Sequence, residues 1–145
     1  MKYQFYVNPD ACTGCRSCEL ACSFTHAVEG VRGLTRINPL LTEFKELWVP
    51  VVCLQCDDAA CVKSCLVDAL RRNEETGAIE LNEDVCVRCM ACVSACPFGC
   101  AILDPQQDKV VKCDLCGGDP ACAHFCPTKA LEWKPAVVVK RKVAV

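Results

Sequence analysis

The stretch Cys86-Val-Arg-Cys89-Met-Ala-Cys92-Val-Ser-Ala-Cys96-Pro97 spaces four cysteines as C-x2-C-x2-C-x3-C and ends in proline. The same spacing runs from Cys12 to Cys22, and the stretches 53–65 and 113–126 differ from it only in the second gap. Sixteen of the 17 cysteines therefore form four groups of four, which is an internal repeat. The groups are Cys12, Cys15, Cys18, Cys22; Cys53, Cys56, Cys61, Cys65; Cys86, Cys89, Cys92, Cys96; and Cys113, Cys116, Cys122, Cys126.

Cysteine dominates a chain of 145 residues, which has the length of one domain. Such a content indicates a disulfide or metal scaffold. The first 22 residues hold no apolar stretch of signal-peptide length, and no run of about 18 apolar residues occurs, so we expect a cytoplasmic chain without a membrane span. Because cytosolic thiols stay reduced, we expect the cysteines to bind metal.

The charge pattern and the motifs exclude several other functions. There are 16 Lys and Arg residues against 18 Asp and Glu residues, with no long basic run, so nucleic-acid binding is not expected. The sequence contains no glycine-rich phosphate loop and no evident pair of catalytic carboxylates. We therefore expect that the chain is not an enzyme by itself.

The spacing within each group points to iron–sulfur clusters. In the bacterial ferredoxin run, three closely spaced thiolates hold one cluster and the fourth ligates the other cluster of a pair. If the third and fourth cysteines lie on one short helix, they share a face but are about 6 Å apart along its axis, which suits two clusters better than one. A proline after the fourth cysteine ends that helix. Structural zinc sites use two ligand pairs separated by a longer loop, so the spacing disfavours zinc.

The segments between the groups predict an α+β fold of short helices and β-hairpins. Before the third group, a turn over 71–77 leads into a strand over 78–81. Before the fourth, strands at 102–103 and 110–111 flank a turn over 104–108. Four residues after each of the last three groups stands a small residue: Ala69, Cys100 and Ala130.

After the first group, about 30 residues replace the short hairpin. Two strands are expected there, at 34–41 and 47–52, and Pro50 implies a sheet edge. This insertion is either a partner-facing surface or packing over the first cluster. A further closing strand is expected at 136–139, although a membrane-surface contact by the basic residues that follow is the alternative.

Several single residues allow two interpretations. Cys100 stands in the slot of Ala69 and Ala130, so we interpret it as a small buried residue that is not a ligand. We expect His26 and His124 to be packed or exposed rather than functional. The cations Arg16, Lys63, Arg88 and Lys112 either favour reduced clusters or are solvated. The aromatic residues Trp48, Trp133, Tyr3 and Tyr6 are interpreted as core or cluster-shielding residues.

The motifs at 86–99, 112–116 and 126–131 resemble those of four-cluster electron-transfer subunits of the dimethyl sulfoxide reductase type. Members of that broad family serve formate dehydrogenases, hydrogenases, carbon monoxide dehydrogenases and tungsten aldehyde oxidoreductases. The resemblance covers roughly residues 3 to 135, and it specifies the cofactor better than the partner.

The resemblance implies four [4Fe-4S] clusters, because no cysteine is missing from the four groups, and it implies that the first group pairs with the fourth and the second with the third. Ser23 and Leu66 stand where a proline often follows the last cysteine, so weaker helix termination is expected there. The implied ligand sets are Cys12, Cys15, Cys18 and Cys126 for cluster 1; Cys53, Cys56, Cys61 and Cys96 for cluster 2; Cys86, Cys89, Cys92 and Cys65 for cluster 3; and Cys113, Cys116, Cys122 and Cys22 for cluster 4.

This pairing implies two bacterial-ferredoxin-like two-cluster modules, one nested inside the other, in a single polyferredoxin domain over 1–145. The outer module would span 1–30 and 105–145, the inner module 50–104, and the insertion 31–49. The implied function is an electron-transfer subunit that connects a larger catalytic redox subunit, with a molybdenum or tungsten pterin enzyme favoured, to an external carrier. That carrier could be a flavin subunit, a soluble ferredoxin or a further copy of the complex. A free polyferredoxin and a cluster scaffold for enzyme maturation are the alternatives.

Overall fold

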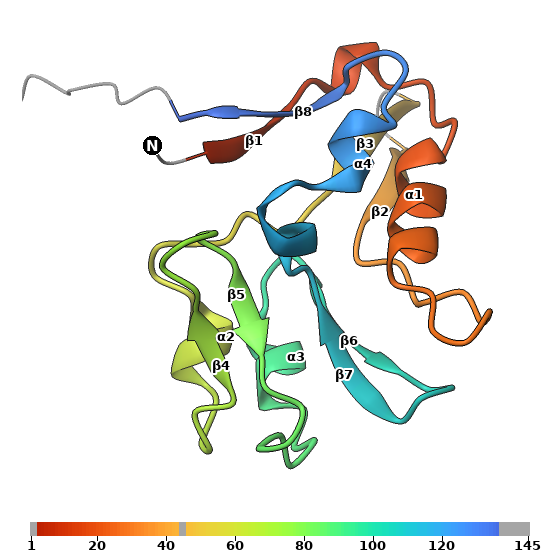
Figure 1. Cartoon of the computed structure of the whole chain (residues 1–145). Helices are drawn as coiled ribbons and strands as arrows, with labels where there is room; N and C mark the ends of the chain where they lie inside the picture. Colours follow the sequence, from red (N-terminus) through yellow and green to blue (C-terminus); the bar gives the residue numbers. More distant parts are fainter. Residues whose placement is uncertain (1–2, 44–45, 137–145) are drawn as a thin grey trace, which may run out of the picture.

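The computed structural model describes residues 3–43 and 46–136 (Figure 1). It consists of short helices and two-stranded antiparallel sheets, so the expected α+β class with hairpins is confirmed. Among the described residues, no helix is long and apolar enough to cross a membrane. The elements are β1 (Tyr3–Val7), η1 (Pro9–Ala11), α1 (Ser17–Thr25), β2 (Asn38–Thr42), β3 (Leu47–Val51), α2 (Ala60–Lys63), β4 (Leu70–Arg72), β5 (Ile79–Leu81), α3 (Ala91–Ala95), β6 (Ala101–Asp104), β7 (Lys109–Lys112), η2 (Leu115–Gly118), α4 (Ala121–His124) and β8 (Leu131–Pro135).

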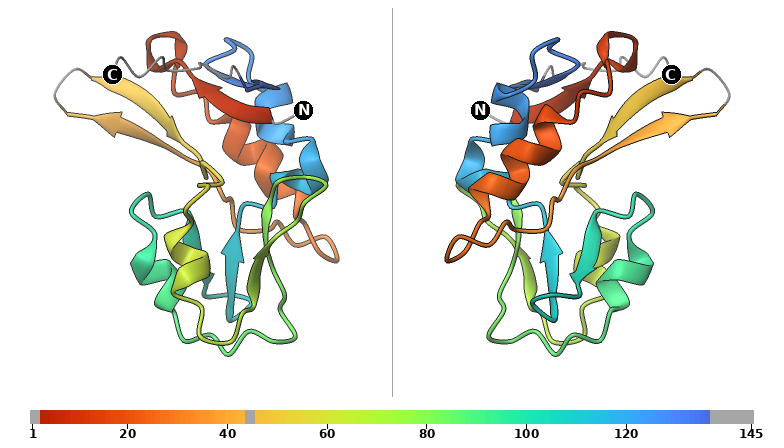
Figure 2. Two further views of the ribbon diagram at one scale, coloured as in Figure 1. Left: turned by 90° about the vertical axis from the view of Figure 1, so that its left-hand side faces the viewer. Right: turned by 90° about the vertical axis from the view of Figure 1, so that its right-hand side faces the viewer.

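The molecule has two halves (Figures 1 and 2). In the first, which we call the α1–α4 half, α1 packs against α4, and β1 pairs with β8 from Tyr3↔Pro135 to Val7↔Leu131. In the second, the α2–α3 half, α2 packs against α3 beside the β4–β5 and β6–β7 hairpins. The first and last described strands thus lie together, and the stretch from α2 to β7 forms the other half.

The four α-helices share one sequence rule, since the third cysteine of each group is the second residue of its helix. Only α1 also contains the fourth cysteine, Cys22. In the other three groups the helix ends before the fourth cysteine, so the third and fourth cysteines share a helix only in the first group. Cys96, for example, is already extended, with ψ of 111°, because Pro97 follows it.

The two positions that lack a proline behave differently. At Ser23 the helix continues to Thr25, as expected. At Leu66 the expectation is wrong, because α2 ends at Lys63. There the Cys65 amide bonds to the Val62 carbonyl, and Asp68 takes a left-handed conformation with φ of 51°, so the chain turns without a proline.

The predicted hairpins form with shifted ends. Residues 71–72, expected in a turn, belong to β4 and pair with β5. Strands β6 and β7 are each one residue longer at both ends than predicted. In the insertion, β2 begins at Asn38 rather than at 34, and β3 ends at Val51 rather than at 52.

The β2–β3 ribbon projects from the α1–α4 half (Figure 2). Pro39 lies directly opposite Pro50 in its register. Neither proline has an N–H, so this position must be a non-hydrogen-bonded pair, whose backbone groups point away from the partner strand. With only two strands, Pro50 lies on a sheet edge, as predicted.

The strands β1 and β8 were not predicted from the sequence. The closing strand was placed at 136–139, which, apart from Ala136, lies outside the described residues; Ala136 itself is not in a strand. Phe5 and Trp133 are directly opposite in the β1–β8 pair, with ring centroids 4.9 Å apart, and Tyr3 stacks on Trp133 at 6.0 Å.

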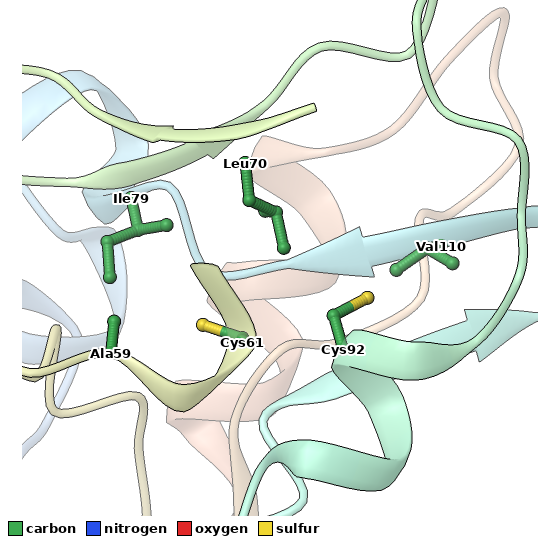
Figure 3. Packing of buried hydrophobic residues seen from close by; sticks show 6 residues of the cluster. All are labelled: Ala59, Cys61, Leu70, Ile79, Cys92 and Val110. Carbon is green, nitrogen blue, oxygen red and sulfur yellow. The ribbon is translucent and has the colours of Figure 1, made fainter. Parts of the chain in front are cut away.

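Both halves have a small core in which cysteine is a main component. Figure 3 shows Cys61 on α2 and Cys92 on α3 beside Leu70, Ile79 and Val110. The core of the α1–α4 half contains Cys22, Ile37, Val52, Cys122 and Leu131. Thiols thus occupy positions that aliphatic side chains fill in most cores.

Candidate metal centres

All seventeen cysteines are free thiols, and they differ in depth. The second cysteines of the first and third groups, Cys15 and Cys89, are exposed, whereas those of the second and fourth groups, Cys56 and Cys116, are half-buried. The first and third groups therefore lie nearer the surface. The buried thiols are Cys22, Cys53, Cys61, Cys92, Cys100 and Cys122, and the remaining ones, Cys12, Cys18, Cys65, Cys86, Cys96, Cys113 and Cys126, are half-buried.

Two cavities are lined by thiols from different groups. One lies in the α2–α3 half and is lined by Cys53, Cys56, Cys61, Cys96 and Cys100, together with Lys112. The other is lined by Cys22, Cys53, Cys113, Cys116 and Cys122, together with His26, Arg36 and Asp114. Cys53 lines both cavities, so the second and fourth groups meet at the junction of the two halves.

Burial raises the pKa of most of these thiols. It raises the pKa of Cys18 to about 11 and that of Cys113 to about 12, and it also raises the pKa of Cys61 and Cys92. A thiol in such surroundings keeps its proton unless a cation stabilises the thiolate. Because metals bind the thiolate, an iron site would supply that charge. The burial of these thiols therefore fits a metal-bound state.

Beyond burial, the charge of a thiolate from another group also raises several of these pKa values. Between the first and fourth groups these pairs are Cys18 with Cys126, Cys116 with Cys22, and Cys122 with both Cys22 and Cys18. Between the second and third groups they are Cys61 with Cys96 and Cys92 with Cys65. The first group is thus close to the fourth, and the second to the third. Cys113 and Cys53 form a further pair across the junction.

The fourth cysteine of every group accepts a backbone N–H on its sulfur. The amides of Ala69, Cys100 and Leu131 donate to Cys65, Cys96 and Cys126 at 3.2, 3.3 and 3.4 Å, from four or five residues further along the chain. Cys22 instead accepts from the amide of Arg36 at 3.3 Å, across 14 residues. These donors stabilise negative charge on sulfur, which is typical of iron–sulfur ligands.

The fold explains why a small residue stands four positions after each of the last three groups. Ala69 and Ala130 are buried, with 1 % and 2 % exposure, in the tight turns in which the amide–sulfur bonds form. Cys100 occupies the same slot, is 6 % exposed, and donates its thiol to the Phe98 carbonyl at 3.5 Å. The prediction of a small buried residue is confirmed. Burial, with the nearby Cys53 and Cys96, raises the pKa of Cys100 to about 12.

His26 is packed, as predicted, and it lies against the fourth group. Its Nε2 is 3.0 Å from the Asp114 carboxylate, and its Nδ1 lies 2.8 Å from the Cys22 carbonyl and 3.8 Å from the Cys22 sulfur. The hydrogen bond with Asp114, aided by Cys22, raises the pKa of His26 to about 9. Burial acts to raise the pKa of the Cys22 thiol, but the hydrogen bonds with His26 and the Arg36 amide outweigh burial and lower it.

The side chain of Arg36 tests whether the cavity of the fourth group fits an anionic cluster. Its Nε and Nη1 atoms are buried and have no hydrogen-bond partner among the described residues, and its side chain lines the cavity of the fourth group. A buried guanidinium without a partner is unfavourable. An anionic cluster held by the thiolates of that cavity would supply the missing acceptors. The donor set therefore fits an iron–sulfur cluster better than a neutral ligand.

The insertion packs over the first group. A Cβ on Gly14, which has φ of +68°, would overlap the indole ring of Trp48. The guanidinium of Arg16 lies 5.9 Å from the centroid of the same ring, in cation–π contact. The packing alternative thus holds for β3, whereas Leu40 and Leu41 of β2 are half exposed.

The charged residues noted in the sequence fall into two classes. Arg16, Lys63 and Arg88 are more than half exposed and pair with Glu19, Asp58 and Asp108. His124 is also exposed and pairs with Asp119. Lys112 alone is buried, and its Nζ lies 3.3 Å from the sulfur of Cys53.

Sequence reasoning missed three polar residues at these sites. Gln55 and Asp114 lie inside cysteine motifs, so their position was a usable signal. Arg36 lies 14 residues after Cys22, and only the fold brings it to the fourth group.

Comparisons with known proteins agree with this geometry. A family model described as a 4Fe-4S dicluster domain matches residues 44–135, and one described as a 4Fe-4S binding domain matches residues 5–24. The chain is 43 % identical to the polyferredoxin-like subunit of the aliphatic sulfonate oxidoreductase of Pyrococcus furiosus, over 83 % of this chain and 69 % of that protein. It is 36 % identical to formate hydrogenlyase subunit 2 of Escherichia coli, over 83 % of this chain and 75 % of that protein.

Among solved structures, the active-site complex BamBC of benzoyl coenzyme A reductase contains a similar chain. The TM-score is 0.53 and the identity 24 %, over 97 % of this chain and 83 % of that chain. At this identity the likeness shows the fold alone.

Proposed function

We propose a specific role for this chain, which belongs to the 4Fe-4S dicluster family of iron–sulfur electron-transfer subunits. It binds four [4Fe-4S] clusters and conducts electrons between a larger catalytic subunit and an external carrier. The observation that carries this proposal is the convergence of thiols from the first and fourth groups in one core and from the second and third groups in the other.

The proposed ligand sets exchange the fourth cysteine within each pair of groups. Cys126 completes the set of Cys12, Cys15 and Cys18, and Cys22 completes that of Cys113, Cys116 and Cys122. Cys96 and Cys65 are exchanged in the same way between the second and third groups. The cores and cavities in which thiols of the paired groups lie together support this exchange, and Cys100 is left as a non-ligand.

The proposed modules follow from these sets, with the inner one at 50–104 nested within an outer one at 1–30 and 105–145. The pairing of β1 with β8 and the packing of α1 on α4 support the nesting, because they join the two ends of the described chain. The proposed boundary between residues 104 and 105 falls where β6 ends and its turn to β7 begins, so this hairpin contributes one strand to each module.

A bound [4Fe-4S] cluster supplies one-electron transfer at a potential that its surroundings set. The chain's own residues determine those surroundings. Backbone amides donate to the fourth cysteines, Lys112 places positive charge beside Cys53, and the Arg36 side chain lines the same cavity as Cys22. Exposed Cys15 and Cys89 mark the proposed ends of the row, where electrons would enter and leave.

The partner is proposed from the relatives. Proteins named as subunits of an aliphatic sulfonate oxidoreductase and of formate hydrogenlyase are similar over most of this chain. We favour a molybdenum or tungsten pterin oxidoreductase as the catalytic partner and a flavin subunit, a soluble ferredoxin or a second complex as the carrier, in the cytoplasm. The alternatives are a free polyferredoxin and a scaffold for cluster maturation.

Iron analysis and size-exclusion chromatography test this function. Anaerobically purified, natively expressed protein should contain about sixteen iron and sixteen acid-labile sulfide per chain, from four cubanes. It should elute with a larger redox subunit. Zinc as the main metal, or half that iron, would contradict the cluster assignment, and a lone, fully loaded monomer with reversible carrier activity would favour the free polyferredoxin.

A further inference from the structure

Lys112, the last residue of β7, lies at the junction of the two halves with 6 % exposure. Its three N–H groups lie within hydrogen-bonding distance of four acceptors: the Cys53 sulfur at 3.3 Å and, each at 3.2 Å, the Gln55 Oε1, the Ile79 carbonyl and the Cys113 carbonyl. The ammonium therefore contacts one proposed ligand of the second group directly and the backbone of another in the fourth.

Gln55 holds this ammonium in place. The Gln55 side chain is 9 % exposed, and its Nε2 donates to the Cys113 carbonyl at 2.9 Å. Its Oε1 accepts the Ile79 amide at 2.9 Å as well as Lys112. Both residues thus belong to one satisfied polar network between the halves, in which the position of the charge is fixed.

The charge of Lys112 is not neutralised by a carboxylate. In the described part of the chain, no Asp or Glu forms an ion pair with it, whereas Lys109 on the same strand pairs with Glu83 at 3.0 Å. Burying an ammonium without a counter-ion is costly. The thiolate form of Cys53 is the natural counter-charge, because its sulfur is the only acceptor of Lys112 that can become an anion.

The third group lacks this arrangement. The residue before its first cysteine is Val85, which carries no charge, and among the described residues no hydrogen bond joins a lysine or arginine to its thiols. Arg88, inside the third group, is exposed and paired with Asp108. The second and third groups, which are proposed to share a module, therefore differ in local charge by one buried cation.

We propose that Lys112 sets the potential of the cluster held by Cys53, Cys56, Cys61 and Cys96 above that of its neighbour held by Cys86, Cys89, Cys92 and Cys65. Reduction adds a negative charge, and a fixed cation stabilises the more negative state. Electrons then collect at the junction of the two halves instead of at the exposed end. This inference rests on the proposed function.

The test is Lys112→Gln in the natively expressed, cluster-loaded protein, with Lys109→Gln as the matched control. Potentials are measured by redox titration followed by electron paramagnetic resonance. In Lys112→Gln, the ratio of reduced to oxidised forms at a fixed potential should fall about tenfold for one cluster, which is about 59 mV for one electron. The cluster that shifts most should be the one that disappears in Cys61→Ala, because Lys112 contacts the sulfur of Cys53 but only the backbone of Cys113. Lys109→Gln should leave all four potentials unchanged.

A second variant, Gln55→Glu, keeps the lysine and places a carboxylate where Oε1 now lies, 3.2 Å from Nζ. It should lower the potential of the same cluster. Unchanged potentials in a Lys112→Gln protein that keeps all its iron overturn the inference. If Lys112→Gln loses iron, the Gln55→Glu variant decides, and unchanged potentials in that variant overturn the inference. Iron loss in both variants also overturns it, because Lys112 would then act structurally. A wild-type protein without four clusters contradicts the proposed function instead.

Discussion

The two halves of the molecule use nearly the same cysteine spacing, but the α1–α4 half contains one fourth cysteine, Cys22, with different surroundings, whereas its other one, Cys126, accepts the Leu131 amide within a tight turn. In the α2–α3 half, Cys65 and Cys96 each accept an amide from four residues further on, within one tight turn. In the α1–α4 half, Cys22 accepts the amide of Arg36 and also contacts His26. The cysteine run is thus a local property of the sequence, whereas the polar surroundings of a ligand depend on distant segments.

Iron removal should have the largest effect, because it acts on both halves. Their cores are small and contain thiols, so anaerobic chelation is expected to unfold the whole chain. Circular dichroism should show loss of the native spectrum, while the same chelator saturated with iron should have no effect. If only one half unfolded, the two cores would be independent; a native-like spectrum would contradict the prediction entirely.

Loss of one ligand should affect one half only. Cys92→Ala in α3 and Cys18→Ala in α1 should each lose or convert one cluster of the four. Iron analysis together with electron paramagnetic resonance of each variant checks this, with wild type as the reference. Loss of two clusters in the same variant would show that the clusters of a half assemble only together.

The variant Arg36→Gln tests the difference between the two halves without removing a proposed ligand. The Arg36 guanidinium, whose Nε and Nη1 are buried without a hydrogen-bond partner among the described residues, lines the cavity that contains Cys22, so the variant should lower the potential of one cluster in the α1–α4 half. We expect a several-fold fall in its reduced fraction at a fixed potential. Arg32→Gln is the control, because Arg32 is exposed in the same insertion. An equal shift in both variants would indicate a general effect of charge.

Cys100→Ala should have the smallest effect. Alanine fills the equivalent slot at position 69, and the amide that donates to Cys96 is kept, so iron content should stay near wild type. The loss of one buried sulfur should cost about 1 kcal/mol of stability. Because five thiols line this cavity, the test is a demanding one. Iron loss equal to that in Cys92→Ala would falsify the non-ligand assignment.

The sequence predicted what is encoded locally. The cysteine groups, the hairpins and the buried small slot could be predicted, because each depends on residues within a few positions. The pairing of β1 with β8 could not, since Phe5 and Trp133 meet across almost the whole chain. Arg36 was missed for the same reason. Lys112 was noted for its charge, but its burial depends on how β7 packs between the halves, which no local pattern reports.

The opposed prolines of the β2–β3 ribbon restrict how that ribbon can meet another molecule. At Pro39 and Pro50 the outward-facing backbone has a carbonyl but no N–H, so each free edge lacks a donor at a central position of its five-residue strand. A third strand could not pair continuously along either edge, which protects the ribbon from edge-to-edge aggregation. Recognition of this ribbon must therefore use side chains, and Leu40 and Leu41 are the apolar ones it exposes most.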